Sequence, residues 1–237
     1  MALLSPFLML LLAAYTVLVE PIARTNFYRN LKKQLNIDPK ARLLFYRTQV
    51  LWEWSWVIVI ALIVIPIPNP LLWLGLVLPN QVGWIILLAL LAGVVLSIVL
   101  LRRSLRALAA MRRSLESSSI LLPSDSAERK WFAITAITAG ICEELLYRGF
   151  LMSFLPTIFP MFAQQFIIIS LISGIINGLS RAYLGMRGMV QTALTGFSFA
   201  IVYFLSGSLL PAMLFHVLAE LRTLILWEPE NKKKKSK

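Results

Sequence analysis

The chain has 237 residues, of which 59% are hydrophobic and 14% are charged. Soluble domains carry about 25% charged residues, so this composition excludes an ordinary soluble globular protein and indicates a membrane protein. No nucleic-acid-binding motif accompanies the formal net charge of +12 at pH 7, so we expect no nucleic acid partner. We attribute the charge instead to membrane topology and to attraction for anionic lipid headgroups.

Seven apolar segments follow one another along the chain, each close to the ~20 residues that a helix needs to cross ~30 Å of hydrocarbon. We expect helices at 2–19, 50–67, 82–101, 131–148, 164–180, 188–206 and 208–227. The first is predicted to be a retained helix, because it lacks the basic n-region of a signal peptide. Residues 66–81 contain four prolines and are predicted as an outer loop. The predicted fold class is therefore an all-α, polytopic transmembrane bundle of about seven spans.

Basic residues predict the orientation of this bundle, because Lys and Arg stay on the cytoplasmic side of short loops. Segments 20–49 and 102–130 hold seven each, whereas the outer loops 68–81 and 149–163 hold none. Arg181, Arg187 and five lysines of the C-terminal tail fall on the same side as the basic segments. We therefore expect a multi-pass protein of the cell membrane with its N-terminus outside and its C-terminus in the cytoplasm.

A few ionisable side chains remain inside the predicted helices. Such groups cost several kcal/mol in hydrocarbon unless they are paired or hydrated, so they are candidates for function. They are Glu53, Glu143, Glu144, Arg148, His216, Glu220 and Arg222. Because Glu53 stands among three tryptophans at the start of its predicted helix, we interpret it as part of an interfacial aromatic belt.

Glu144 and Arg148 are four residues apart, so they share one helix face and neutralise each other as a structural clamp. Glu143 points about 100° away and has no partner on its own helix, which suits a general base near neutral pH. On the last predicted helix, His216 and Glu220 are also four residues apart. A lone histidine often only packs, but burial in lipid beside a carboxylate favours a catalytic role for His216.

Three motifs occur in order along the second half of the chain: EELLYRGF at 143–150, AYLGMRG at 182–188 and GSLLPAMLFH at 207–216. Together they resemble the CPBP family of intramembrane proteases, the CAAX-processing and bacteriocin-processing enzymes also called the Abi family. The resemblance implies a protease core at 131–227, preceded by N-terminal transmembrane helices at 1–130 and followed by a basic tail at 228–237. It also implies a membrane-associated or lipidated peptide or protein as substrate.

The resemblance implies a role for each matching residue. Glu143 is expected to activate water for attack on a peptide carbonyl, and Arg148 corresponds to the arginine of the same motif. His216, with Glu220 at the position of its partner, is expected to stabilise the oxyanion. The chain departs from the family at Glu220, where the family has Asn or Asp, a side chain one carbon shorter than Glu.

The middle family motif, FxxxH, is altered in this chain, where NGLSR places Asn177 and Arg181 at the two defining positions. Arginine cannot replace a neutral imidazole as a proton acceptor, because its guanidinium stays protonated. Three roles for Arg181 stay open. It can reach Glu143 and weaken it as a base, it can donate to an oxyanion, or it can only mark the cytoplasmic end of its helix.

Other chemistries have less support in the sequence. A zinc hydrolase needs three protein ligands, and one His and one Cys without an HExxH motif lead us to expect neither a catalytic metal nor another cofactor. Cys142 paired with His216 is a conceivable nucleophile, although a small buried packing role suits it better. A transporter is expected to show paired repeats, which this sequence does not clearly have. The alternative from another class is a catalytically silent relative that acts as a membrane binding or immunity protein.

The charge distribution makes a testable prediction about topology. Reporters fused after Lys237 and inserted into 102–130 are expected to lie in the cytoplasm, and a reporter near residue 75 outside the cell. Alkaline phosphatase and green fluorescent protein fusions distinguish the two sides. An external signal from 102–130 would contradict both the helix assignment and the placement of the candidate site.

Overall fold

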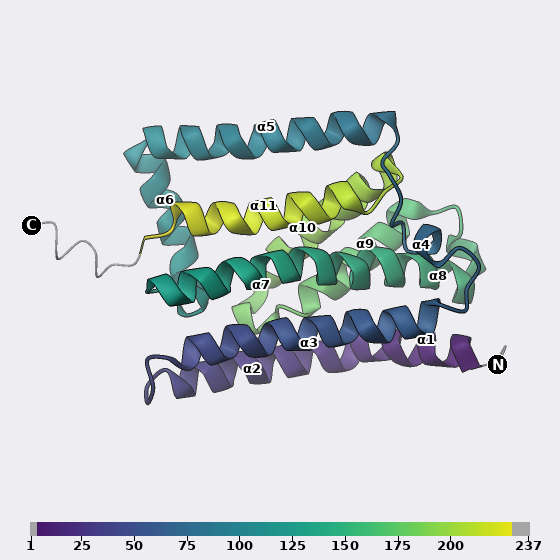
Figure 1. Cartoon of the computed structure of the whole chain (residues 1–237), viewed down its shortest axis with the longest axis horizontal. Helices are drawn as coiled ribbons and strands as arrows, with labels where there is room; N and C mark the ends of the chain where they lie inside the picture. The colour runs from purple at the N-terminus through teal and green to yellow at the C-terminus, as the bar shows by residue number, and fades with distance from the viewer. Residues whose placement is uncertain (1–3, 229–237) are drawn as a thin grey trace, which may run out of the picture.

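The computed structural model describes residues 4–228. Every regular element in this range is a helix, which confirms the all-α prediction. The first two residues of the first predicted segment and all but the first residue of the predicted tail lie outside the described range. The helices of the described range form a bundle whose N- and C-terminal ends lie at opposite ends of its long axis (Figure 1).

Long helices run back and forth along the bundle. The first rod joins α1 (Leu4–Ala14), the π-helical η1 (Tyr15–Val19) and α2 (Glu20–Gln34). It is followed by α3 (Ala41–Val64) and α5 (Gln81–Arg103), and a second composite rod joins α7 (Ser126–Glu144), the π-helical η3 (Leu145–Leu151) and α8 (Met152–Ile158). The last rods are α9 (Phe166–Leu179), α10 (Gly185–Ser206) and α11 (Leu210–Leu226). Shorter connecting helices are α4 (Pro70–Trp73), α6 (Leu105–Leu115), η2 (Glu116–Leu121), η4 (Pro160–Phe162) and η5 (Ala182–Leu184).

Four helices of the described range are long and apolar enough to cross a membrane by length and composition: Pro6–Gln34, Ala41–Val64, Gln81–Arg103 and Ala182–Ser206. The helix α9 is apolar but has only 14 residues, and α11 has 17. The helix α7 carries the charges of the candidate site. These apolar helices make the chain a membrane protein, while the count of seven spans stays a prediction.

The first two rods are longer than predicted. Residues 20–49, predicted as a cytoplasmic loop, are helical except for the connection at 35–40. Glu20 and Arg24 continue the first apolar helix because they are four residues apart and neutralise each other, with Arg24 Nε 2.6 Å from Glu20 Oε1. Both side chains are buried inside the bundle. The expectation that every basic residue of 20–49 faces the cytoplasm is therefore wrong for Arg24.

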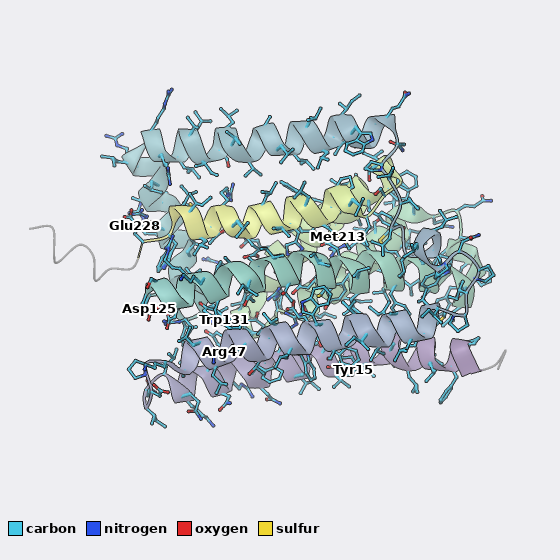
Figure 2. All side chains as sticks on the ribbon, in the orientation of Figure 1. Tyr15, Arg47, Asp125, Trp131, Met213 and Glu228 are labelled. Carbon is cyan, nitrogen blue, oxygen red and sulfur yellow. The ribbon has the colours of Figure 1, made fainter. Side chains whose placement is uncertain are left out.

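The composite rod that carries the candidate site is also longer than the predicted 131–148. It begins at Ser126, because the side chain of Asp125 accepts a hydrogen bond from the backbone N–H of Glu128 and caps the helix. It then continues without interruption to Ile158. Near its start, the guanidinium of Arg47 on α3 lies 4.9 Å from the ring centre of Trp131 on α7 (Figure 2). This contact joins the two helices at the end of the bundle where α7 begins.

The order of packing places α7 at the centre. α5, α11, α7, α3 and α2 follow one another across the bundle, and α9 and α10 pair behind them (Figure 1). The 35–40 connection and α6 lie at one end, whereas the connections after α3 and α8 lie at the other. The basic segments of the sequence thus gather at one end of the structure.

The predicted outer loop 66–81 is folded against the bundle. Leu209 donates its backbone N–H to Gly75 O at 2.8 Å, and Asn80 donates to Ser206 O at 3.0 Å. Gly75 has a φ of 71°, in the left-handed region that glycine tolerates at low cost. The loop therefore holds the α10–α11 turn and fixes where α11 begins.

Candidate active site

Close contacts between helices bring the site together. A Cβ atom at Gly140 would collide with Val217, so the glycine lets α7 and α11 approach each other one turn before the two glutamates. Glu143 and Glu144 are the last residues of α7, and the π-helical η3 that follows carries Arg148. All seven residues of η3 are buried. Such π turns are rare and frequently occur at functional sites.

Glu144 binds two cationic or polar partners on one oxygen. Arg148 donates from an Nη atom to Glu144 Oε1 at 3.0 Å, and His216 Nδ1 lies 2.9 Å from the same oxygen. Both Glu144 and Arg148 are fully buried. The sequence-based pairing of Glu144 with Arg148 thus matches the geometry. The contact of His216 with Glu144, between α11 and α7, was not predicted.

This contact defines how the His216 ring is oriented. A carboxylate that already accepts from Arg148 offers only acceptor atoms, so Nδ1 of His216 carries the proton of the shared hydrogen bond. Nε2 makes no hydrogen bond within residues 4–228, and His216 lines the internal cavity. Nε2 is therefore the ring nitrogen without a protein partner among the described residues.

Asn177 extends the cluster behind Glu144. With its amide oriented so that both ends are satisfied, its oxygen accepts from the two Nη atoms of Arg148 at 3.2 and 3.3 Å. Gly196 leaves room for this contact, because a Cβ there would meet both Arg148 and Asn177. The first position of the altered FxxxH motif thus supports the Glu144–Arg148 pair.

Glu143 is held by two guanidinium groups from other parts of the chain. Its Oε1 accepts from Arg181 at 2.5 Å and lies 3.0 Å from an Nη atom of Arg24. The side chain is only 3% exposed. Oε2 makes no hydrogen bond in the described part of the chain. Glu143 lacks a partner on its own helix, as predicted, but two other segments supply one each.

Arg181 therefore reaches Glu143, one of the three roles left open by the sequence. Its second Nη donates to the hydroxyl of Tyr183 at 2.9 Å. The Tyr183 ring in turn stacks on Tyr28 of α2, with ring centres 4.9 Å apart. Arg181 is 22% exposed, so the turn after α9 places a partly accessible cation over Glu143. A role limited to marking the helix end is inconsistent with these contacts.

Two further site residues, Arg24 and Glu53, come from the N-terminal helices. Besides Glu143, Arg24 contacts Glu20 through Nε and Glu53 through an Nη atom at 3.4 Å. Glu53 is 4% exposed, so the interpretation of Glu53 as part of an interfacial belt is wrong. The physical reason is that α3 begins at Ala41, which places Glu53 roughly three turns inside the helix. The spacing of Glu20 and Arg24 was the available signal for a buried pair.

A cavity of about 1000 Å³ connects these residues. Its charged or titratable lining includes Arg24, Glu53, Glu143, Arg181, His216 and Glu220, together with Tyr28 and Tyr183. Glu144 and Arg148 do not line it and lie behind its wall. Glu220 makes no hydrogen bond or ion pair within the described range, and His216 bonds Glu144 instead of Glu220. The cavity is large enough for a peptide segment beside Glu143.

The donor set of the site does not suit a metal ion. No group of three or more His, Cys, Asp and Glu side chains is arranged to hold one within residues 4–228. Glu143 and Glu144 already bind guanidinium groups. Cys142 is buried and is not part of the cavity lining, which gives it no access to a substrate as a nucleophile.

Comparison with protein families identifies the C-terminal part of the chain. Residues 126–221 match the model of the Rce1-like family, described as type II CAAX prenyl endopeptidases. This segment is similar to the Rce1-like family. The match confirms the predicted relationship to the CAAX proteases of the CPBP family. No curated protein and no solved structure matches the chain.

The Rce1-like segment contains six of the candidate residues: Glu143, Glu144, Arg148, Arg181, His216 and Glu220. It begins with α7 and ends within α11, close to the predicted core of 131–227. Arg24 and Glu53 lie outside it, although both line the same cavity. The site therefore combines the Rce1-like segment with the N-terminal helices.

The buried Glu144–Arg148 pair makes a prediction about stability. Arg148→Ala leaves Glu144 with His216 but without its guanidinium, so the free energy of unfolding is expected to fall by about 3–5 kcal/mol. Removing both charges in Glu144→Gln with Arg148→Met is expected to restore much of the loss. Thermal unfolding in detergent and abundance in membranes measure both effects, with the exposed Arg29→Ala as control. A double variant as unstable as Arg148→Ala would show that the charge pair is not the cause.

Proposed function

We propose that the protein is an intramembrane endopeptidase of the CAAX-processing type, which hydrolyses a peptide bond in a membrane-associated or lipidated protein. One observation carries the proposal. Glu143 and His216 line the same cavity, and each is anchored through one polar atom while its other atom, Oε2 or Nε2, has no protein partner among the described residues. The similarity of residues 126–221 to the Rce1-like family supports protease activity in general.

In the proposed reaction, Glu143 activates a water molecule. Oε2 of Glu143 accepts a proton from the water while the water oxygen forms a bond to the carbonyl carbon of the substrate. The π electrons of the carbonyl group move to the carbonyl oxygen, which becomes the oxyanion. Arg24 and Arg181 favour the charged form of Glu143, which makes it a weaker base. The same Arg181 supplies a fixed positive donor near the cavity for the developing oxyanion, an effect that is worth several kcal/mol in sites that exclude water.

We assign His216 to the stabilisation of the oxyanion. Glu144 holds the ring through Nδ1 and stabilises the imidazolium form, whose Nε2–H is then a donor toward the cavity. Arg148 acts behind Glu144 and does not line the cavity, whereas Asn177, whose oxygen accepts from Arg148, is part of the cavity lining. Glu220, one turn further along α11, adds negative charge near His216 and also favours the imidazolium.

We further propose that this reaction needs no metal ion, because no group of three or more His, Cys, Asp and Glu side chains among the described residues is arranged to hold one, and Glu143 is bound by Arg24 and Arg181. For the orientation, we propose an outer N-terminus and a cytoplasmic C-terminus. The clustering of the basic segments at one end of the bundle supports this orientation.

A catalytically silent binding protein is the second candidate. The 2.5 Å contact between Arg181 and Glu143 favours it, because a tightly paired carboxylate is a poor base. In that case the cavity binds a lipidated or membrane-inserted peptide without cleaving it. The two candidate functions predict different effects of an Arg181 substitution on peptide cleavage.

The first test compares wild type with Glu143→Gln on a library of prenylated and membrane-spanning peptides in lipid nanodiscs. Loss of a general base is expected to reduce kcat by about 10²–10⁴-fold, with unchanged abundance. Mass spectrometry of the products measures cleavage, and the exposed Asp38→Asn serves as control. A chelator is expected to leave the wild-type rate unchanged. Equal cleavage by wild type and Glu143→Gln would overturn the assignment of Glu143.

The second test varies Arg181. If Arg181 stabilises the oxyanion, Arg181→Lys reduces turnover and Arg181→Ala reduces it further, because the fixed fork and then the charge are lost. If Arg181 silences the site, wild type cleaves nothing and Arg181→His uncovers hydrolysis at neutral pH. Arg29→Ala controls for the loss of a surface charge. Unchanged cleavage in Arg181→Ala would contradict both roles.

A further inference from the structure

Glu53 shares the cavity of the candidate site although it lies outside the Rce1-like segment. It comes from α3, is 4% exposed, and lines the same cavity as Glu143 and His216. A carboxyl group at this depth is costly unless it is paired or protonated. The partners of Glu53 therefore determine whether its carboxyl group is paired or protonated.

The guanidinium of Arg24 is shared among three carboxyl groups. Its Nε lies 2.6 Å from Glu20 and one Nη lies 3.0 Å from Glu143. Glu53 has the longest of these contacts, 3.4 Å from the other Nη to Oε1. Its second oxygen, Oε2, is buried and has no hydrogen-bond partner within the described residues. Glu53 is thus the least neutralised carboxyl group of the cluster.

The charges of this cluster do not balance when every group is ionised. Among the groups in direct contact, Glu20, Glu53 and Glu143 supply three negative charges, against two positive charges from Arg24 and Arg181. The imidazolium proposed for His216 contacts Glu144 and none of these three carboxyl groups. The remaining contacts of Glu20 are the neutral donors Tyr15 and Trp52. Because unpaired buried charge is unfavourable, the cluster is most stable when one carboxyl group holds a proton. The orphaned Oε2 of Glu53 is the atom best placed to hold it.

We propose that Glu53 is a further catalytic residue, whose carboxyl group holds a proton in the resting site and delivers it to the leaving amine. The inference rests on the proposed endopeptidase function. It accounts for the chain's departure at position 181, because arginine cannot exchange protons as an imidazole does. Glu53 then supplies the proton exchange that the altered motif lacks.

The proton transfers balance. Glu143 takes one proton from water as the C–O bond forms, and Glu53 gives its proton to the nitrogen as the C–N bond breaks. The products are a free acid and a free amine, with a proton on Glu143 and none on Glu53. Return of that proton from Glu143 to Glu53 restores the resting site, and both carboxyl groups contact the same guanidinium group, that of Arg24.

Infrared spectroscopy tests the resting proton without requiring activity. A protonated carboxyl group has a C=O stretching band separate from that of carboxylates, and we expect this band in wild type and its loss in Glu53→Gln. Glu53→Asp should shift the band, whereas Glu20→Asp and the buried, arginine-paired control Glu128→Gln should leave it in place. A band absent from wild type, or unshifted in Glu53→Asp, would overturn the proposal.

Cleavage kinetics test the catalytic part. Glu53→Gln is expected to lower kcat by about 10²–10⁴-fold with little change in KM or abundance, because the amide matches the neutral acid in size and charge. Glu53→Asp should recover part of the rate. Full activity of Glu53→Gln beside an inactive Glu143→Gln would overturn the role of Glu53 alone. An inactive wild type would overturn the proposed function as well, while the infrared band still locates the proton.

Discussion

The need to neutralise charge inside an apolar bundle governs how this site is built. Two adjacent carboxylates point to different sides of α7, and each takes its cations from different parts of the chain. Glu144 is paired behind the cavity wall by Arg148 and by His216 of α11. Glu143 is paired at the cavity surface by Arg24 of α2 and by Arg181 after α9. Ion pairing thus ties η3, α11, α2 and the turn after α9 to the end of α7.

Glu143 and Glu144 differ in role because only Glu143 has access to the cavity. Glu144 and Arg148 are fully buried, and Oε1 of Glu144 contacts both Arg148 and the His216 ring. Oε2 of Glu144 and Nε of Arg148 have no hydrogen-bond partner among the described residues. One oxygen of Glu143, a residue that lines the cavity, has no hydrogen-bond partner among the described residues, and its partner Arg181 is partly exposed. The buried Glu144–Arg148 pair stabilises the fold and orients the His216 ring. Glu143, whose Oε2 has no partner among the described residues, can bind a water molecule. Adjacent residues of one motif therefore have separate tasks.

The sequence predicted the parts of this site that depend on local spacing. The apolar segments gave the approximate positions of the long helices, and the four-residue spacing of Glu144 and Arg148 gave their contact. The His216–Glu144 contact joins residues that are 72 positions apart. Helix periodicity identifies neighbours only within one helix, so it favoured Glu220 as the partner of His216 instead.

The sequence did not predict that Arg24 of the N-terminal helices belongs to the site, and the reason is different. Positive residues near the end of an apolar segment ordinarily mark a cytoplasmic loop, and Arg24 has that sequence context among six other basic residues of 20–49. Counting charges cannot distinguish the buried Arg24 from the six other basic residues of this segment. Only the carboxyl groups of Glu20, Glu53 and Glu143, which come from three different helices, make its burial favourable. The same shared arginine leaves Glu53 under-neutralised, so the N-terminal helices do more than cover the Rce1-like segment: they determine the charge balance in which Glu143 has to work.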